Sequence, residues 1–310
     1  MDINPAVIIQ QFFNALTLGA IYALIALGYT MVYGIIELIN FAHGDVFMVG
    51  AFTGMWLLTV PLAQRGAIND PLLLAAILLL VFAITMPVIG LLGVGIERFA
   101  YRPLRNAPRL APLLTAIGVS FILQNIIQTI FGPSPKTTPR LFPNAAGIDV
   151  GTVHVSAVTI FIFSLAVALI IALQTFINRT RLGRAMRSTA QDREAAQLMG
   201  VNINRTIALT FFIGSALAGA GGIVFGLYSG QISFTLGFSA GLKAFTAAVL
   251  GGIGNTTGAA LGGFMIGFVE VYSGQLGLFR WSEALVFAVL IIVLVFRPSG
   301  ILGQPIGERA

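Results

Sequence analysis

Residues 179–200 read RTRLGRAMRSTAQDREAAQLMG, a polar stretch with many arginines in the middle of an otherwise apolar chain. Long apolar segments lie before it and after it. A basic loop between two apolar segments is typical of the cytoplasmic side of a membrane protein. The stretch therefore predicts a helical membrane fold in which this loop stays outside the bilayer, between two membrane-spanning helices.

The second half of this stretch has the start and stop signals of a short helix. Thr189, with Asp192 three residues later, resembles a capping box, and Gly200 tolerates the left-handed conformation that ends a helix. The residues expected on one apolar face are Ala195, Leu198 and Met199, with Ala196 beside them keeping that face flat. A short helix held outside the membrane by two spans is typical of a docking element.

The composition places the chain among helical membrane proteins. Hydrophobic residues make up 57% and charged residues 9% of the 310 residues, and the mean hydropathy is +0.95. Soluble domains carry about 25% charged residues. The apolar runs are also too long and unbroken for the alternating strands of roughly ten residues in a membrane barrel. We therefore expect an all-α, polytopic fold with a single transmembrane domain over residues 1–310, and the loop at 179–205 within it.

Several functional classes are disfavoured by the charges and the reactive residues. The net charge of +6 does not indicate nucleic-acid binding, because the arginines cluster at the ends of apolar segments. The chain has no cysteine, and its two histidines, His43 and His154, lie too far apart in sequence to suggest a metal site. No nucleophile–base pair is visible. The glycines at 251–254 lack the strand, turn and lysine of a phosphate-binding loop. We expect neither an enzyme nor a chain that binds its own cofactor or metal.

The apolar segments predict eight to ten transmembrane or re-entrant helices. Residues 6–36 would be about 46 Å long as one helix, against a hydrocarbon core of roughly 30 Å. We therefore expect a span over about 7–28, then a broken or tilted helix to about 39, with breaks at Gly28 and Gly34. The glycine-dense segment at 236–274 is expected to cross twice or re-enter. The other predicted spans cover about 44–60, 72–96, 110–131, 155–178, 206–228 and 281–297.

The arginine distribution predicts the orientation. The loop at 98–109, the loop at 179–205 and the tail from 297 carry four, six and two of the 17 basic residues. The positive-inside rule places these segments in the cytoplasm, with the N-terminus outside and the C-terminus inside. The connector at 132–151 is rich in Pro, Thr and Asn and is expected outside. It is either a contact for an external partner or a plain solvent loop.

Polar residues inside apolar segments are the candidates for a translocation path. Asn40, His43 and Asp45 lie together in the stretch ELINFAHGDVFMVGAF at 37–52. They either cap the helix that follows or line the path, because a helix break in a membrane exposes backbone groups that need partners. Lys243 lies in the glycine-dense segment. It either belongs to the path, or reaches the interface or pairs near a helix end.

The sequence EAAQLMG at 194–200 resembles the EAA-x-x-x-G loop of bacterial ABC importer permeases. The Leu-Pro that follows in that pattern is not kept, since Leu209 is followed directly by Thr210 and not by proline. In that family the loop forms a coupling helix that fits a groove of the cytoplasmic ATPase. The resemblance implies that Glu194 contacts a basic or hydrogen-bonding group of the ATPase. The coupling residues that it implies are Glu194, Ala195, Ala196 and Gly200.

Other parts of the chain resemble the branched-chain amino-acid permeases of the LivH type. These are YG at 33–34, NFAHG at 40–44, MVGA at 48–51 and RPSGILG at 297–303. Related permeases for urea and short amides carry similar sequences. The resemblance implies a multi-pass protein of the bacterial inner membrane that imports branched-chain or related neutral amino acids. Its implied partners are membrane lipid, a second permease subunit in a heterodimer, two cytoplasmic ATPase subunits that hold ATP and Mg, and a periplasmic substrate-binding protein.

A self-sufficient secondary transporter or channel is the alternative from another class. Broken helices and buried ionisable groups would suit it. Glu37, Asp45 and Glu270 are scattered in the sequence, however, and form no readable proton or sodium relay. The sequence does not by itself identify which amino acid or amide is carried.

Overall fold

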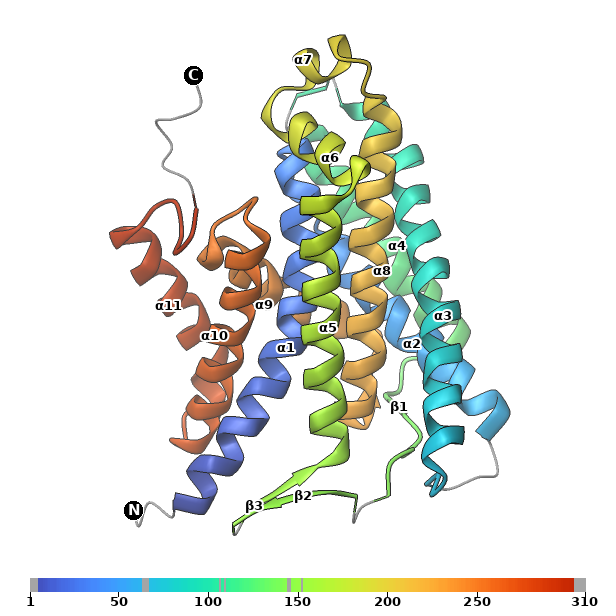
Figure 1. Cartoon of the computed structure of the whole chain (residues 1–310), viewed down its shortest axis with the longest axis vertical. Helices are drawn as coiled ribbons and strands as arrows, with labels where there is room; N and C mark the ends of the chain where they lie inside the picture. Colours follow the sequence, from blue (N-terminus) through green and yellow to red (C-terminus); the bar gives the residue numbers. More distant parts are fainter. Residues whose placement is uncertain are drawn as a thin grey trace.

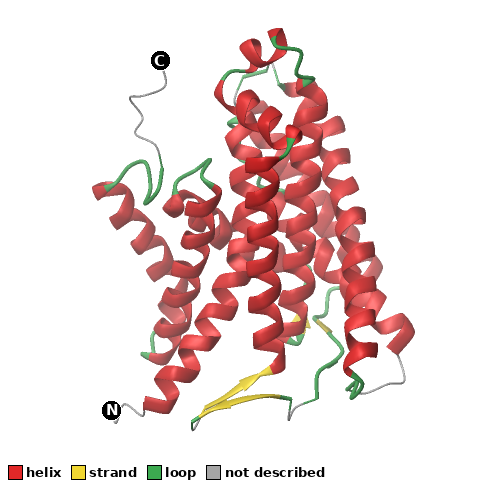
Figure 2. Cartoon of the chain, in the orientation of Figure 1, coloured by secondary structure: helices red, strands yellow, loops and turns green. Residues whose placement is uncertain are grey.

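The computed structural model describes residues 5–62, 67–105, 107–108, 110–143, 146–151 and 153–303. Arg109 of the predicted cytoplasmic loop and the tail beyond Gly303 lie outside the described residues. The described chain is mainly helical, with two very short two-stranded sheets (Figure 2). Six of the described helices are long and apolar enough to cross a membrane. The predicted helical, polytopic fold class is confirmed.

Long helices form the body of the molecule and shorter elements lie at its two ends (Figure 1). The helices of the body are α1 (Pro5–Ile36), α2 (His43–Leu62), α3 (Pro71–Ile96), α4 (Leu110–Phe131), α5 (Ala157–Arg179), α8 (Ile203–Ser229), α9 (Leu236–Gly251), α10 (Thr256–Gln275) and α11 (Ser282–Phe296). The shorter helices are α6 (Arg181–Gln191), α7 (Arg193–Leu198), a π-helical turn (Glu97–Tyr101), and 3-10 turns at Arg102–Leu104 and Phe279–Trp281. The strands are β1 (Lys136–Thr137), β2 (Gly147–Val150), β3 (Val153–Ser156) and β4 (Gln231–Ile232).

The central helix of the bundle is α1, which packs most extensively along α10 and α8. It is continuous to Ile36, so the predicted breaks at Gly28 and Gly34 are wrong. Gly28 serves close packing instead, since a Cβ there would lie 2.8 Å from the carbonyl oxygen of Gly214. The helix ends at Glu37, whose φ of +56° places it in the left-handed region. From Ala15 to Val32 nearly every residue of α1 is buried by surrounding helices, so the chain continues as one helix past Gly28.

The helical structure is interrupted between α1 and α2, and α2 begins deep inside the bundle. His43, the first residue of α2, packs edge-on against Tyr29 with ring centroids 4.7 Å apart, and also meets Gly28. Because Gly28 is eight residues before the end of α1, α2 starts about 12 Å below that end. The first two turns of α9 meet the same point, since a Cβ on Gly44 would lie against the carbonyl oxygen of Gly237 and 2.8 Å from Gly241 Cα. Two helix starts therefore meet inside the bundle.

Small residues allow the closest contacts in the core. A Cβ on Gly50 of α2 would lie 2.6 Å from Gly219 Cα of α8. Such contacts between small residues are how membrane helices approach one another closely. The buried face of α8 is correspondingly rich in glycine and alanine. Pro87 lies inside α3.

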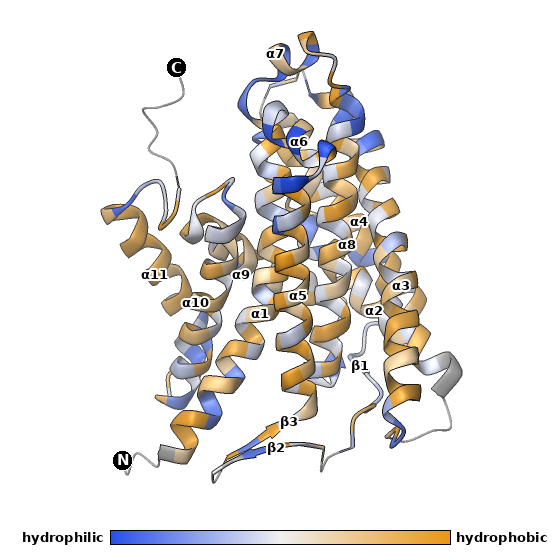
Figure 3. Cartoon of the chain, viewed as in Figure 1, coloured by the Kyte–Doolittle hydropathy of each residue, from blue (hydrophilic) through white to orange (hydrophobic). Residues whose placement is uncertain are grey.

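The polar segments gather at the two ends of the bundle. At the upper end in Figure 1 lie α6, α7 and the end of α1, while the start of α1 and the strands β1 to β3 lie at the opposite end. The helix α11 ends lower, at the left of the view. Figure 3 shows hydrophilic residues concentrated around α6 and α7, above a hydrophobic body. The described parts of the two arginine-rich loops, 98–109 and 179–205, therefore share one end of the molecule, as the charge pattern predicts.

The connector at 132–151 is attached to the bundle and is not a free solvent loop. Its strand β1 pairs antiparallel with β4, and β2 forms a hairpin with β3. The Thr138 hydroxyl donates a 2.6 Å hydrogen bond to the carbonyl of Gly226, at the end of α8. Thr138 and Leu141 are both buried. The connector thus covers the end of the bundle opposite α6 and α7.

Candidate functional site

The short helix α7 starts at Arg193, with Asp192 as its N-cap. The Asp192 carboxylate accepts a 2.9 Å hydrogen bond from the backbone N–H of Ala195, which leaves that donor satisfied. Thr189 lies within α6, where its hydroxyl donates to the carbonyl of Ala185. The prediction that Thr189 caps this helix is therefore wrong, because its side chain bonds back to the preceding turn. The extended backbone of Asp192 separates α6 from α7.

The C-terminal stop of α7 is the one that the sequence predicts. Gly200 has φ +83°, and its N–H donates to the carbonyl of Gln197. The N–H of Val201 donates to the carbonyl of Ala196. This pair of bonds is the Schellman pattern, in which a left-handed residue closes the helix. A side chain with a Cβ is disfavoured at this φ, so Gly200 gives α7 a fixed length.

The outward face of α7 carries the predicted residues Ala195, Leu198 and Met199, and differs from the prediction only at Ala196. Leu198 is 87% exposed and Met199 is 85% exposed, whereas Ala196 is only 4% exposed. Leu198 lies about 200° around the helix from Ala196, so the two residues point to opposite sides. Glu194 and Ala195 are exposed. The prediction of a flat docking surface that includes Ala196 is wrong, and the exposed apolar pair is Leu198 and Met199.

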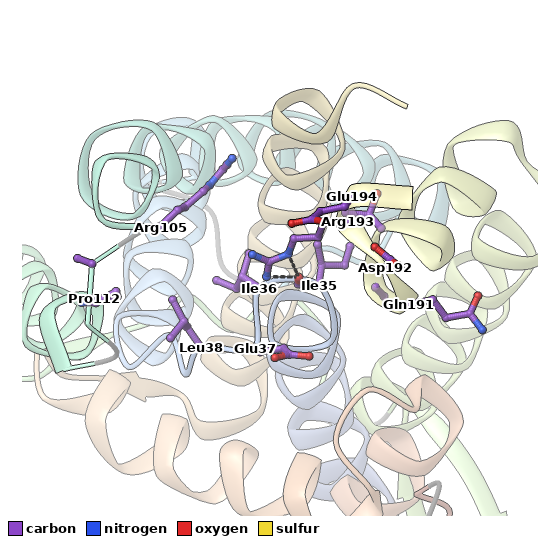
Figure 4. A pocket seen from close by; sticks show the side chains of 13 residues that line it. Ile35, Ile36, Glu37, Leu38, Arg105, Pro112, Gln191, Asp192, Arg193 and Glu194 are labelled. Carbon is purple, nitrogen blue, oxygen red and sulfur yellow. Dashed lines mark hydrogen bonds between the residues drawn. The ribbon is translucent and has the colours of Figure 1, made fainter. Parts of the chain in front are cut away.

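A cavity of about 420 Å³ lies beside α7, at the end of α1 (Figure 4). Arg193 crosses it and donates two hydrogen bonds, from Nη2 at 2.6 Å and from Nε at 3.2 Å, to the carbonyl oxygen of Ile35. Side chains of positive and of negative charge line this cavity. Its lining includes Ile35, Ile36, Glu37, Leu38, Arg105, Pro112, Gln191, Asp192, Arg193 and Glu194.

A buried carboxylate organises the neighbouring turn. Glu97 is fully buried and accepts from Arg102 at 2.8 and 3.2 Å and from Arg105. Arg105 also donates a 2.6 Å hydrogen bond to Asn204 in the first turn of α8. Burial lowers the pKa of the Arg105 guanidinium, and Glu97 beside it acts in the opposite direction. The cluster fastens the end of α3 to the start of α8, directly after the loop that carries α7.

Asn40 and Asp45 connect the start of α2 to other helices. Tyr101 donates a 3.0 Å hydrogen bond to the side-chain oxygen of Asn40. Asp45 accepts from the hydroxyl of Ser120 and, at 3.0 Å, from the side-chain amide of Gln124 in α4. Both side chains are buried and accept hydrogen bonds from residues of other elements. This differs from the capping role that the sequence allowed. The carboxylate also lies in the first turn of α2, where the helix dipole favours a negative charge.

Lys243 pairs with Glu270 inside the bundle. The Nζ and Oε1 atoms are 2.6 Å apart, and the Tyr22 hydroxyl donates to the other carboxylate oxygen at 2.7 Å. The side chains are 13% and 22% exposed, so the pair is only partly open to the surroundings. Lys243 therefore joins α9 to α10 and has a partner set separate from that of Asn40, His43 and Asp45.

The family model described as the permease component of the branched-chain amino acid transport system matches residues 11–294. The chain belongs to this family. The high-affinity branched-chain amino acid transport system permease protein BraD of Pseudomonas aeruginosa is 44% identical over 304 residues, 97% of each chain. The permease protein LivH of Escherichia coli (strain K12) is 42% identical over 307 residues, again 97% of each chain. The probable branched-chain amino acid transport permease protein LivH of Methanocaldococcus jannaschii is 26% identical over 229 residues. No solved structure matches the chain.

Sequence reasoning missed two residues that organise the arginine-rich end of this permease. Glu97 directly precedes Arg98 at the start of an arginine-rich loop, and a lone acid there was a usable signal for a buried ion pair. Arg193 gave no such signal, because it lies among many other arginines in the loop at 179–205. Its partner, a backbone carbonyl 158 residues away, carries no sequence signature at all.

Proposed function

We propose that this chain is the inner-membrane permease subunit of a bacterial ABC importer for branched-chain or related neutral amino acids. The observation that carries the proposal is α7, a capped helix at the arginine-rich end that presents Leu198 and Met199 outward. A short helix with an exposed apolar pair, fixed between α6 and α8, is suited to fit a groove of an ATPase subunit. Glu194 lies exposed on the same helix and is positioned to pair with a basic group of that partner.

In the proposed topology the N-terminus is outside and the C-terminus inside. The common end of the two arginine-rich loops supports this orientation, because basic loops remain in the cytoplasm. The eight to ten membrane helices are the six long apolar ones together with α2, α9 and α10, which enter the bundle beside them. The whole chain, residues 1–310, acts as one transmembrane domain.

ATP hydrolysis takes place in two partner ATPase subunits, which hold ATP and Mg. This chain forms the pathway together with a second, similar permease subunit, and a periplasmic binding protein delivers the amino acid. Movement of the ATPases displaces α7, and the helices then alternate between outward and inward access. The binding protein performs most of the selection, so this chain needs no tight substrate pocket of its own.

The translocation path passes the start of α2, with Asn40, His43 and Asp45, and involves Lys243. Polar and ionisable groups within membrane helices typically face a path or another protein chain, since exposure to lipid is costly. Two helix starts meet at Gly44 and Gly237, which places two helix N-termini and their polar backbone groups at one depth. In the structure Asn40, His43 and Asp45 are buried and the Lys243 side chain is 13% exposed, as expected when the path is closed.

The direct test is reconstitution of the chain with its partner subunits in liposomes. Uptake of leucine, isoleucine or valine is measured with the loaded binding protein and with ATP present or absent. The proposal requires uptake that depends on ATP and on the binding protein. Uptake driven by an ion gradient without ATP would establish a secondary transporter instead. Competition by urea or acetamide, with no effect of leucine, would assign the chain to the amide permeases.

The orientation is tested separately by labelling single cysteines, because the native chain contains none. Gln191→Cys lies at the end of α6 and Ser134→Cys lies in the connector, and both positions are exposed. A membrane-impermeant maleimide added to intact spheroplasts should label Ser134→Cys and leave Gln191→Cys unlabelled. The reverse pattern would invert the topology and remove α7 from the cytoplasm.

A further inference from the structure

The docking helix is connected directly to the central helix of the bundle by one side chain. Arg193, the first residue of α7, donates both of its hydrogen bonds to the carbonyl oxygen of Ile35 in the last turn of α1. Figure 4 shows the guanidinium reaching this carbonyl across the cavity. The two residues are 158 positions apart, so the bond joins two distant parts of the chain.

The chemistry of this contact favours a firm attachment. The last four carbonyls of a helix have no partner within the helix, and the helix dipole makes that end negative. A guanidinium placed there satisfies the carbonyl and complements the dipole. Because α1 packs along α10, α8, α9 and α5, a displacement of its last turn acts on the helices at the centre of the fold.

The end of α1 also leads directly to the buried polar groups. Glu37 follows with its left-handed backbone, and the chain then returns into the bundle to Asn40 and the start of α2. Tyr101 holds Asn40 by its side chain. The neighbouring cavity of about 420 Å³ gives the end of α1 and the junction of α6 and α7, residues 189–194, space in which to move. A continuous physical connection therefore runs from α7 through Arg193 and Ile35 to the start of α2.

We propose that Arg193 is the positioning residue that transmits movement of α7 to α1 and to the start of α2. The inference rests on the proposed function, in which α7 is the element that docks on the ATPase. Without the Arg193 bonds, α7 still docks, but its displacement no longer moves the helix that controls the path. ATP hydrolysis and transport then become uncoupled.

The same loop contains a matched control. Arg187 of α6 also donates from its guanidinium to a backbone carbonyl, that of Ile177 in the last turn of α5. The two contacts use the same chemistry, a guanidinium on the last turn of a helix. The Arg187 contact is local, over ten residues, and does not reach α1. If the loop needed only its basic charge, removing either arginine would have the same effect. If Arg193 transmits the movement, only the removal of Arg193 uncouples hydrolysis from transport.

The test uses the assembled complex in liposomes with the loaded binding protein. The variants are Arg193→Ala, Arg193→Lys and Arg187→Ala. The readouts are co-purification of the ATPases, basal and stimulated ATP hydrolysis, and amino acid transported per ATP. Arg193→Ala should co-purify normally but lose stimulation and transport per ATP by at least about fivefold, the scale of a typical coupling energy. Arg193→Lys keeps the positive charge but loses the paired contact with the Ile35 carbonyl and should lie between, and Arg187→Ala should match the wild type.

Three results would overturn the proposal. One is wild-type stimulation and transport per ATP in Arg193→Ala, and another is an equal loss in Arg187→Ala. The third is failure of both Arg193 variants to assemble while Arg187→Ala assembles, which would make Arg193 a folding residue. Failure of the proposed function gives a different result. In that case Leu198→Asp, on the exposed face of α7, would leave ATPase co-purification unchanged.

Discussion

The short helix α7 and the start of α2 each gather polar residues beside a helix end, but they are stabilised in different ways. The helix α7 is closed by its own neighbours, Asp192 at one end and Gly200 at the other. The start of α2 is held by residues of other elements, with Tyr101 on Asn40 and Ser120 and Gln124 on Asp45. The first kind of site is local in sequence, and the second exists only after the bundle has assembled.

The difference predicts how each region responds to change. Substitutions at α7 should act mainly on a partner, because its outward face is free in this chain. Substitutions at the start of α2 should act on the fold of this chain, because that region has no free face. The two regions are linked through Arg193, so the comparison also separates effects on docking from effects on transmission.

The largest effect is expected from Gly44→Val at the start of α2. A Cβ there would lie 2.8 Å from Gly241 Cα, and backbone atoms cannot be displaced as a flexible side chain can. Overpacking a core costs about 1–3 kcal/mol or more, so the amount of monodisperse protein recovered in detergent should fall sharply. The control is Gly118→Val on the exposed face of α4, where a Cβ would meet nothing within 4 Å. Equal recovery of the two variants would contradict the close contact of α2 with α9.

The next effect is expected at the exposed face of α7. Leu198→Asp should weaken ATPase binding by about 2 kcal/mol, roughly thirtyfold, as for a central interface residue. The melting temperature of the permease itself should not change, since the side chain is 87% exposed. Leu198→Met keeps the apolar contact and should bind normally. Binding of purified ATPase subunits to the reconstituted permease measures this, and unchanged binding of Leu198→Asp would remove α7 as the docking element.

Ala196→Trp distinguishes the two faces of α7. Because Ala196 is buried, a tryptophan there should destabilise the permease by about 1–3 kcal/mol. Thermal unfolding monitored by the intrinsic fluorescence of the detergent-solubilised protein measures this loss. Leu198→Trp adds the same side chain to the exposed face and should leave the unfolding temperature unchanged. If the two variants unfold at the same temperature, Ala196 does not pack against the chain.

A smaller effect is expected from Asn40→Ala. The variant loses the hydrogen bond from Tyr101, a contribution of about 1 kcal/mol. Transport should decrease to the same extent for leucine, isoleucine and valine, because the contact supports the start of α2 and does not select the substrate. Tyr101→Phe removes the same bond, so the double variant should be no worse than either single one. A change in the preferred amino acid at normal protein level would instead make Asn40 a specificity residue.

The smallest effect is expected from Gly200→Ala. At φ +83° a Cβ costs about 1 kcal/mol. The last turn of α7 should fray slightly and the affinity for the ATPase should fall by less than in Leu198→Asp. Gly200→Asn is the control, because asparagine tolerates the left-handed conformation. An affinity loss in Gly200→Asn as large as in Gly200→Ala would show that side-chain bulk matters there, and not the backbone conformation.

The sequence by itself determined the class of the fold, most of the helices and the presence of a capped helix in the arginine-rich loop. These features are local. Span length, apolar composition, arginine position and a left-handed glycine are each encoded within a few neighbouring residues. The helices predicted at 72–96 and 110–131 match α3 and α4 closely for this reason.

Only the tertiary structure decided what the local pattern left open. Whether Gly28 breaks a helix or packs a neighbour depends on His43 and Gly214, which contact it from other helices. Which face of α7 is buried depends on where the loop folds back onto the bundle. The partners of Lys243, Asp45 and Arg193 are Glu270, Gln124 and the carbonyl of Ile35. Contacts between residues so far apart are fixed by the packing of whole helices, and a single sequence carries no periodic signal for them.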